Sequence, residues 1–360
     1  MKILNVVTSL RFGGAERLIE ETAPLLKSRG CFLDVCIFDG GETPLKRSLT
    51  DKGINIISFG KKKNIYRPSI FFKLLKLMRK YDIVHTHNTS PQFFAALAGL
   101  FCRCKLITTE HSTSNRRRNY WLFEILDKWM YEQYDRIVCI SDATKESLTE
   151  YIGSVKTKAI VINNGIDVQK FKSAVPLSLS EVNTKKFVVT MVSGFRYQKD
   201  HDTLLRAMSY LNKDKYEIWL VGEGDRRSVI VDLIRELNLS QNVRLWGSSD
   251  DIPSIMKSSD VIVQSSHIEG FGLTAVEGMA AGKPVIASNV PGLSQVVYGA
   301  GFLFPEGDAK ALASLIEMLS ENRYIYDRVS FDCLKRAELY DISIMVDKLY
   351  DLYQAELGVL

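Results

Sequence analysis

The sequence of 360 residues has few cysteines, and no two of the six stand in a Cys-x-x-Cys pair. This spacing indicates neither a zinc knuckle nor a disulfide framework, so we expect reduced thiols in a cytoplasmic protein. The longest apolar run, Phe93–Cys102, has about half the length that a membrane-spanning helix needs. No charged-then-apolar leader precedes the first apolar run at 3–7. The sequence therefore predicts a protein that is neither secreted nor membrane-spanning.

Signatures of other nucleotide-binding enzymes are also missing. The turn after the first apolar run contains Gly13-Gly14, but it has neither a Gly-x-Gly-x-x-Gly pattern nor a Walker lysine. This absence argues against a nicotinamide or ATP site. The net charge of +5 is mildly basic, which allows an acidic partner without requiring one. We expect no nucleic-acid partner.

Apolar runs that are typical of buried strands alternate with helical patterns in two blocks. A loose polar segment at 172–186, which contains Pro176, separates the blocks. We therefore predict an α/β fold with two Rossmann-like, doubly wound domains, 1–172 and 173–339, that face each other across a cleft. The expected strands are 3–7, 33–38, 54–58, 82–85, 105–109, 136–140 and 159–162 in the first domain, and 187–192, 216–221, 243–245, 260–263 and 284–287 in the second.

The most informative stretch is a loop that ends in Gly270-Phe271-Gly272 and leads into a helical pattern at Leu273. The loop follows the expected strand at 260–263. A helix that begins after such a loop has free backbone N–H groups, where a phosphate binds favourably. We expect the amides of Gly272, Leu273 and Thr274 to hold a diphosphate.

Two carboxylates bracket this helix start, Glu269 before the glycines and Glu277 one turn into the helix. Glu277 can bind a ribose diol, as an acidic residue does in dinucleotide folds. Glu269 lies on the other side of the phosphates, where a transferred group would sit. The alternatives are a helix cap for Glu269 and a solvated helix surface for Glu277.

The spacing of Glu269 and Glu277 resembles the Glu-x7-Glu motif of retaining glycosyltransferases of the GT4 class, which have the GT-B fold. The flanking residues Ser258-Ser259-Asp260 and Gly282-Lys283-Pro284-Val285 are similar as well. The resemblance extends over essentially the whole chain. It implies that an amphipathic C-terminal helix at 340–360 crosses back to the N-terminal domain.

A cationic loop follows the expected strand at 187–192, and Lys and Arg side chains there suit a diphosphate. Lys199 stands where the resembled motif has its lysine, but Gly194 stands where that motif has an arginine. We expect Arg196, displaced by two positions, to reach the same phosphate. Lys199, Arg196 and the amides of the second loop would then stabilise the leaving diphosphate.

Other turns after strands complete the predicted donor site. Gly222 follows a strand and is expected to line the nucleotide pocket. The resemblance implies that Gly13 and Gly14 border the diphosphate and the acceptor pocket, and that the backbone at Trp246 and Gly247 reads the base. A bland tight turn is the alternative for Gly13 and Gly14.

Three histidines lie near the ends of expected strands. His85 and His87 have the i, i+2 spacing that points both rings to one side of a strand. No nearby carboxylate or cysteine completes a metal site around them, and we expect neither a metal nor another cofactor. His111 follows a strand, and the resemblance implies that it contacts hydroxyls of the transferred sugar and helps to place the acceptor.

A basic amphipathic stretch at 61–80 is consistent with a surface helix packed on the core. The alternative is peripheral contact with an anionic membrane, at the inner face of the bilayer. Arg116-Arg117-Arg118 would extend that basic surface or bind an anionic acceptor.

Together these features predict a retaining glycosyltransferase that moves a hexosyl or N-acetylhexosaminyl group from a nucleotide-diphosphate sugar. We expect UDP rather than GDP, and a glycan or lipid-linked acceptor in surface polysaccharide biosynthesis. Front-face transfer and a covalent glutamate intermediate both remain open. The alternatives are a nucleotide-sugar epimerase of the same architecture and a non-catalytic nucleotide-sugar-binding protein.

Overall fold

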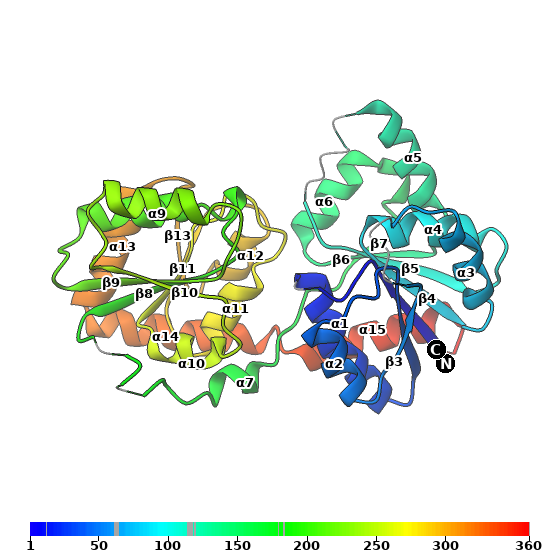
Figure 1. Cartoon of the computed structure of the whole chain (residues 1–360), viewed down its shortest axis with the longest axis horizontal. Coiled ribbons are helices and arrows are strands. Elements are labelled where there is room, and N and C mark those ends of the chain that lie inside the picture. Colours follow the sequence, from blue (N-terminus) through cyan, green and yellow to red (C-terminus); the bar gives the residue numbers. More distant parts are fainter. Residues whose placement is uncertain are drawn as a thin grey trace. The chain divides into compact units, whose positions relative to one another are not determined.

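The chain forms two compact units, which a computed structural model describes at residues 1–11, 13–60, 65–113, 118, 120–178, 180–182 and 184–359 (Figure 1). The first unit contains Met1–Gly165 and Ile342–Leu360, and the second contains Ile166–Asp341. The sequence analysis had placed the change of domain at 172. The structure differs because helix α7 (Val168–Lys172) packs on α10 and α11 of the second unit.

The segment at 172–186, expected as a linker, also belongs to the second unit. Leu177 and Val182 pack against the buried cluster around Trp219, and the backbone N–H of Leu177 donates to Ser258 Oγ at 2.7 Å. Apolar side chains therefore tie this irregular segment to the second unit.

The first unit is built on a seven-stranded parallel sheet with the order β3-β2-β1-β4-β5-β6-β7. Its central strands are almost fully buried, because helices cover both faces of the sheet. The elements are β1 (Lys2–Val7), α1 (Gly14–Ser28), β2 (Phe32–Ile37), α2 (Pro44–Asp51), β3 (Asn55–Ser58), α3 (Ser69–Met78), β4 (Ile83–His87), α4 (Thr89–Gly99), β5 (Lys105–Glu110), α5 (Trp121–Glu132), β6 (Arg136–Cys139), α6 (Asp142–Tyr151), β7 (Ala159–Val161) and α15 (Ile342–Glu356).

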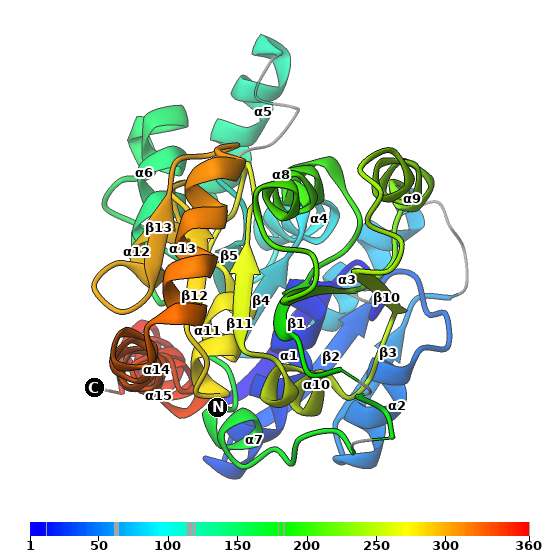
Figure 2. The ribbon, with the colours of Figure 1, turned by 90° about the vertical axis from the view of Figure 1, so that its left-hand side faces the viewer.

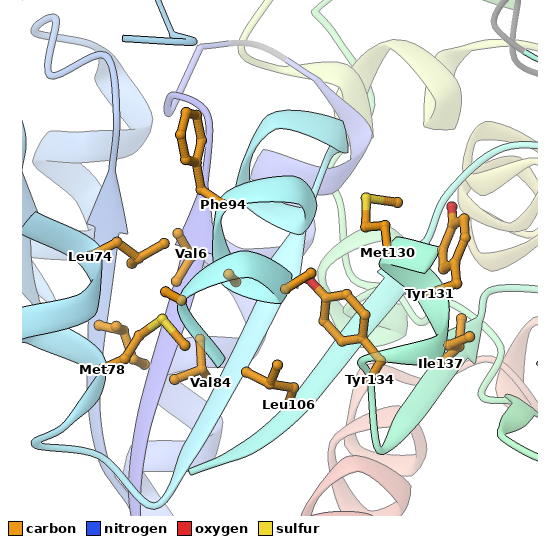
Figure 3. Close-up of a cluster of buried hydrophobic side chains, with 14 of the residues drawn as sticks. Val6, Leu74, Met78, Val84, Phe94, Leu106, Met130, Tyr131, Tyr134 and Ile137 are labelled. Atoms are coloured by element: carbon orange, nitrogen blue, oxygen red, sulfur yellow. The ribbon is translucent and has the colours of Figure 1, made fainter. Parts of the chain in front are cut away.

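Two hydrophobic clusters hold this sheet between its helices. One lies between the sheet and α3, α4 and α5, and includes Leu74, Phe94 and Met130 (Figure 3). The other lies beneath α1, α2 and α15, where Val346 and Tyr353 of α15 are buried. The C-terminal helix is therefore part of the first unit, as the family resemblance implied.

The second unit is built on a six-stranded parallel sheet with the order β10-β9-β8-β11-β12-β13. Helices α8, α9 and α13 cover one face, and α10, α11 and α14 cover the other (Figure 2). The elements are α7, β8 (Phe187–Val192), α8 (His201–Ala207), β9 (Tyr216–Val221), α9 (Arg227–Glu236), β10 (Val243–Gly247), α10 (Ile252–Ser258), β11 (Val261–Gln264), α11 (Leu273–Ala280), β12 (Val285–Ser288), α12 (Leu293–Val297), β13 (Phe302–Phe304), α13 (Ala309–Glu321) and α14 (Arg323–Glu338).

The predicted α/β class and the repeated strand–helix alternation are confirmed. Among the described residues, no helix combines the length and the apolar character needed to cross a bilayer. Helix α3 of the basic stretch at 61–80 packs on the core, and contact of this stretch with a membrane stays a prediction. Lys61–Lys63 lie outside the described residues, as do Arg116 and Arg117.

Candidate functional site

The strand order of the second sheet brings two loops together. β8 and β11 are parallel neighbours, but the chain continues from β8 to one side of the sheet and from β11 to the other. Ligands of open α/β sheets bind at such a reversal, beyond the carboxyl ends of the strands. The loop at 193–200 follows β8, and the loop at 265–272 follows β11. These loops contain the predicted residues Arg196, Lys199 and Glu269.

Side-chain and backbone contacts join the two loops. Lys199 Nζ lies 2.5 Å from Glu269 Oε2, and the two side chains are 27% and 18% exposed. The backbone N–H of His267 donates to the carbonyl of Gln198 at 2.9 Å. Ser265 Oγ donates to the carbonyl of Asp200 at 2.6 Å. The structure therefore pairs the predicted cation with the first predicted carboxylate, within reach of solvent.

Helix α11 begins directly after the second loop and carries no side-chain cap. Its N-cap residue, Gly272, has φ of 101°, a conformation that side chains other than glycine rarely adopt. A Cβ there would also lie 2.6 Å from Leu293 Cδ1. Phe271 anchors the loop, since its ring is buried against Tyr340 with the centroids 5.3 Å apart. Leu273 and Thr274 occupy the first turn, where backbone N–H groups lack helical acceptors.

Gly292 packs against the backbone of the same loop. Its φ is 82°, and a Cβ at this position would lie 2.4 Å from the carbonyl oxygen of Glu269 and 2.7 Å from the carbonyl carbon of Gly270. The backbone of the loop therefore rests directly on that glycine.

Glu277 lies four residues after Leu273 on α11, and it is only 5% exposed. A buried carboxylate costs free energy unless other groups compensate its charge. The alternative of a solvated surface residue is therefore wrong for Glu277. Its predicted contact with a ribose stays a prediction.

Arg196 lies next to the position that the family resemblance assigns to an arginine. Its Nε is 3.6 Å from the place that a Cβ of Gly194 would occupy, and its backbone N–H donates to the Gly194 carbonyl at 2.8 Å. The side chain is exposed and, within the described part of the chain, makes no hydrogen bond or ion pair. The guanidinium group is thus available to a ligand beside Gly194.

The turns after β9 and β10 adjoin the first loop. Gly222 has φ of 138°, and a Cβ there would lie 2.1 Å from the carbonyl oxygen of Ser193. The N–H of Gly222 donates to the Gly247 carbonyl at 2.8 Å. Trp246 is half-buried, with Arg244 stacked 3.7 Å above its ring. The three predicted residues Gly222, Trp246 and Gly247 therefore lie at adjacent strand ends.

The first sheet has its own reversal between β1 and β4. Gly13 is the N-cap of α1 and Gly14 is its first residue. A Cβ on Gly14 would have no heavy atom within 4 Å, whereas a Cβ on Gly13 would lie 2.1 Å from Glu16 Oε2. Open space therefore lies beside Gly14, and the Glu16 side chain fills the space beside Gly13. Asn88, after β4, has φ of 69°, and its side chain accepts from the backbone N–H of Thr8 at 3.5 Å.

The three histidines of the first unit form a contiguous stack. The rings of His85 and His87 are stacked with centroids 4.6 Å apart, as their i, i+2 spacing predicts. His87 Nδ1 lies 3.1 Å from His111 Nε2. His85 lies within 2.6 Å of the Tyr353 hydroxyl and 2.7 Å of Thr109 Oγ1.

Burial keeps these imidazoles neutral. Desolvation lowers the pKa of His111 to about 4, and desolvation with the neighbouring His111 lowers the pKa of His85 to about 3. The pKa of His87 lies well below its usual value for the same reasons. A neutral His111 can donate one hydrogen bond to a sugar hydroxyl or accept one from it, while its Nε2 contacts His87.

The described residues contain no group of three or more His, Cys, Asp or Glu side chains arranged to hold a metal ion. Asp200-His201-Asp202 has an Asp-x-Asp sequence, whereas we had expected the chain to lack one. Asp200 caps α8 through the N–H of Thr203 at 3.2 Å, and Asp202 pairs with Arg226 at 3.0 Å. Both carboxylates thus have protein partners, and metal independence stays a prediction.

Two contributors escaped the sequence analysis. His87 was considered only as a metal ligand, although the pairing of His87 with Thr109 between β4 and β5 would have placed it near His111. His267 joins the two site loops, with Nδ1 2.7 Å from Glu306 Oε1 and its ring 5.0 Å from that of Tyr197. Only its position in the loop just before Glu269 pointed to it.

Comparison with known proteins agrees with this geometry. Residues 178–331 match the family described as glycosyl transferases group 1, and residues 12–170 match glycosyltransferase family 4. The chain belongs to these glycosyltransferases. Each unit matches one of the two family models, so the protein is an enzyme of the glycosyltransferase class.

Relatives with similar sequences carry related descriptions. An Escherichia coli UDP-Gal:alpha-D-GlcNAc-diphosphoundecaprenol alpha-1,3-galactosyltransferase is 29% identical over 78% of this chain and 77% of its own length. An uncharacterized glycosyltransferase of Haemophilus influenzae is 27% identical over 93% of this chain and 95% of its own.

Solved structures show the same fold. The Anabaena protein HepE in complex with UDP-glucose superposes with a TM-score of 0.87 at 23% identity, and covers 100% of both chains. A sucrose-phosphate synthase of Thermosynechococcus elongatus superposes with a TM-score of 0.82 at 21% identity, also over 100% of both chains. These likenesses confirm the predicted GT-B fold.

Proposed function

We propose that this enzyme is a retaining glycosyltransferase that moves a hexosyl or N-acetylhexosaminyl group from a UDP-sugar to a glycan or lipid-linked glycan. The fold shared with a UDP-glucose complex supports the choice of UDP. The E. coli relative, whose description names UDP-Gal and a diphosphoundecaprenol-linked GlcNAc, supports a lipid-linked acceptor. Surface polysaccharide assembly is a role that fits such an acceptor.

The observation that carries the proposal is the pairing of Lys199 with Glu269 beside the uncapped start of α11. Without a donor, the carboxylate balances the charge of the lysine. When a nucleotide-diphosphate sugar binds, Lys199 and Arg196 turn to the diphosphate, together with the amides of Gly272, Leu273 and Thr274. Fixed positive groups at the leaving oxygen are an efficient form of catalysis because they need no reorganisation during the reaction.

The two carboxylates then have separate roles. Glu269, released from Lys199, binds hydroxyls of the transferred sugar and stabilises the positive charge that develops at its anomeric carbon. Glu277 binds the ribose diol from the interior of α11. Gly222, Trp246 and Gly247 lie at the adjacent strand ends and receive the base. In the first unit, Gly13 and Gly14 border the diphosphate and the acceptor, with open space beside Gly14, and neutral His111 hydrogen-bonds a sugar hydroxyl.

In the reaction, the acceptor hydroxyl oxygen forms a bond to the anomeric carbon while the bond from that carbon to the diphosphate oxygen breaks. The acceptor proton passes to the leaving phosphate on the same face, which retains the anomeric configuration. The alternative is a covalent intermediate on Glu269, which would retain configuration through two inversions.

Nucleotide binding and turnover test the proposal separately. Thermal unfolding is followed with UDP, GDP and ADP, and a ligand that binds the native state raises the midpoint. We expect the largest rise with UDP. UDP-sugars are then supplied with and without an undecaprenyl-diphosphate-linked sugar, and NMR identifies the anomer of the product. A changed donor sugar without acceptor would indicate an epimerase, and UDP binding without any turnover would indicate a binding protein.

A further inference from the structure

The turn that carries Lys199 has no buried side chain of its own. It is the short 3₁₀ turn Tyr197–Lys199 in the loop after β8, and none of its residues is buried. The loop is anchored on either side of this turn, at Phe195, which is 1% exposed, and at Asp200, which is 3% exposed. An exposed segment with few buried contacts is mobile, so the place of the lysine depends on contacts from outside the turn. We call residues 197–199 the Lys199 turn.

His267, in the loop after β11, contacts two of the three residues in the Lys199 turn. Its backbone N–H donates to the carbonyl of Gln198 at 2.9 Å. Its ring lies against the ring of Tyr197, with the centroids 5.0 Å apart and an angle of 34° between the planes. His267 therefore holds the turn through its backbone and through its side chain.

A carboxylate fixes the orientation of this imidazole. Nδ1 of His267 lies 2.7 Å from Oε1 of Glu306, in the loop after β13. An ionised carboxylate only accepts hydrogen bonds, so Nδ1 donates in this contact. Nε2 lies 3.7 Å from Asp200 Oδ1, beyond hydrogen-bond range, and that oxygen already accepts from the N–H of Thr203 at 3.2 Å. Glu306 therefore sets the tilt of the His267 ring against the Lys199 turn.

The ring of Tyr197 has a second partner. The guanidinium carbon of Arg226 lies 5.8 Å from the ring centroid, and Arg226 pairs with Asp202 at 3.0 Å. The tyrosine is nevertheless 66% exposed, so it contributes little apolar burial. Its contacts with His267 and Arg226 thus hold the ring in place, and with it the Lys199 turn.

These contacts serve geometry more than stability. The side chains of His267 and Glu306 are 23% and 49% exposed, and such exposed pairs contribute little to the free energy of unfolding. The contact of His267 with Gln198 adjoins the contact of Glu269 with Lys199 along both loops. A shift of the first contact therefore moves the lysine of the second. Misplacement of a group by about 1 Å can lower a rate about 100-fold.

We propose that His267 is a positioning residue: oriented by Glu306, it fixes the Lys199 turn so that the lysine ammonium group lies beside the start of α11. In this assignment His267 acts through Lys199. The inference rests on the proposed function, in which Lys199 stabilises the leaving diphosphate. A histidine that served only the stability of the fold would change the free energy of unfolding and leave both the order of the turn and the turnover number unaltered.

Two measurements on the full chain test this assignment. Hydrogen exchange of the amides in segment 193–200, read by mass spectrometry, reports how firmly the turn is held and needs no turnover. Steady-state kinetics with a UDP-sugar and an undecaprenyl-diphosphate-linked sugar gives kcat and KM. The variants are His267→Ala, Glu306→Ala, Glu306→Gln, Lys199→Ala and His267→Ala/Lys199→Ala. The matched control is Asn242→Ala, just before β10 in the same sheet, where the side chain donates to the Tyr216 carbonyl at 3.1 Å.

We expect exchange in segment 193–200 to be about tenfold faster in His267→Ala, and kcat to fall about tenfold with little change in KM for the donor. Glu306→Gln keeps an acceptor for Nδ1, so it should retain most of the kcat that Glu306→Ala loses. His267→Ala should cause no further loss once Lys199 is absent, because residues that act as a unit are not additive. Asn242→Ala should lower the free energy of unfolding without changing exchange in this segment or kcat.

The proposal falls if exchange in segment 193–200 is unchanged in His267→Ala, or is accelerated equally in Asn242→Ala. It also falls if the losses from His267→Ala and Lys199→Ala multiply in the double variant, since His267 would then act independently of Lys199. The proposed function fails separately, if the wild-type enzyme transfers no sugar or if Lys199→Ala keeps the wild-type kcat. Exchange in the segment then still decides whether His267 holds the turn.

Discussion

Lys199 Nζ lies 2.5 Å from Glu269 Oε2, although the two residues are 70 positions apart in the sequence. This contact joins the loop after β8 to the loop after β11. Because both side chains retain access to solvent, the pair contributes little to stability, on the order of 1 kcal/mol or less. Its value is geometric, since it holds a cation and a carboxylate beside the start of α11.

Replacing Lys199 by Ala should therefore reduce catalysis much more than stability. Removal of one preorganised group that stabilises a leaving group typically lowers kcat by about 10²–10³-fold. The matched control is Lys335→Ala, which breaks the exposed pair with Glu338 at 3.3 Å far from the predicted site residues in the sequence. Steady-state kinetics and urea unfolding are measured for both. A Lys199→Ala enzyme with wild-type kcat would contradict the assignment.

The role of Arg196 can be tested by moving its positive charge to position 194. Arg196→Ala should lower kcat/KM for the donor by about 10–100-fold, as loss of a charge-assisted hydrogen bond does. A Cβ on Gly194 would meet only ordinary contacts, at 3.6 and 3.7 Å, so an arginine is sterically possible there. The double variant Gly194→Arg/Arg196→Ala should then recover much of the activity. If Arg196→Ala alone is fully active, the cation has no role in turnover.

The buried position of Glu277 predicts selective recognition of ribose. In the wild-type enzyme UDP should bind about tenfold more tightly than 2′-deoxy-UDP, because a hydrogen bond to a charged group is worth about 1.5–3 kcal/mol. Glu277→Gln should weaken UDP binding and reduce the difference between the two nucleotides. Calorimetry measures all four affinities, with the exposed Glu321→Gln as a control. An undiminished preference for UDP in Glu277→Gln would place the ribose elsewhere.

Much of the fold could be predicted because its physical signal is local. Strands buried on both faces appear as continuous apolar runs, and twelve of the strands were expected from these runs, whereas β13 was not. That strand has only three residues, Phe302–Phe304, and it lacks the β-branched residues that marked the equally short β7 (Ala159–Val161). The domain boundary was displaced because α7 is short and its membership of the second unit depends on packing against α11.

Individual site residues could be predicted from the sequence, but the contacts between them could not. Glycines and charges after strands marked both loops, but the contact of Lys199 with Glu269 depends on the order of β8 and β11 in the sheet. The link from Tyr353 through His85 to the histidine stack was equally invisible. It joins residues 268 positions apart and requires α15 to pack on the first sheet.

The histidine stack predicts that the first unit loses stability in mild acid. The folded-state pKa of His111 is lowered to about 4 and that of His85 to about 3, whereas an unfolded His titrates near pH 6.5. A lowered pKa contributes stability that is present above the unfolded value. Between about pH 6.5 and 4 the unfolded chain binds more protons, so the free energy of unfolding falls as the pH falls.

His87→Gln removes one of these groups and can still hydrogen-bond His111. We expect the slope of unfolding free energy against pH, between pH 6 and 4.5, to decrease, by at most about 1.4 kcal/mol per pH unit, the value for one proton. Urea unfolding at several pH values, monitored through hydrogen exchange of amides in β4 and β5, measures this slope. Equal slopes for His87→Gln and the wild type would show that His87 is protonated in the folded enzyme.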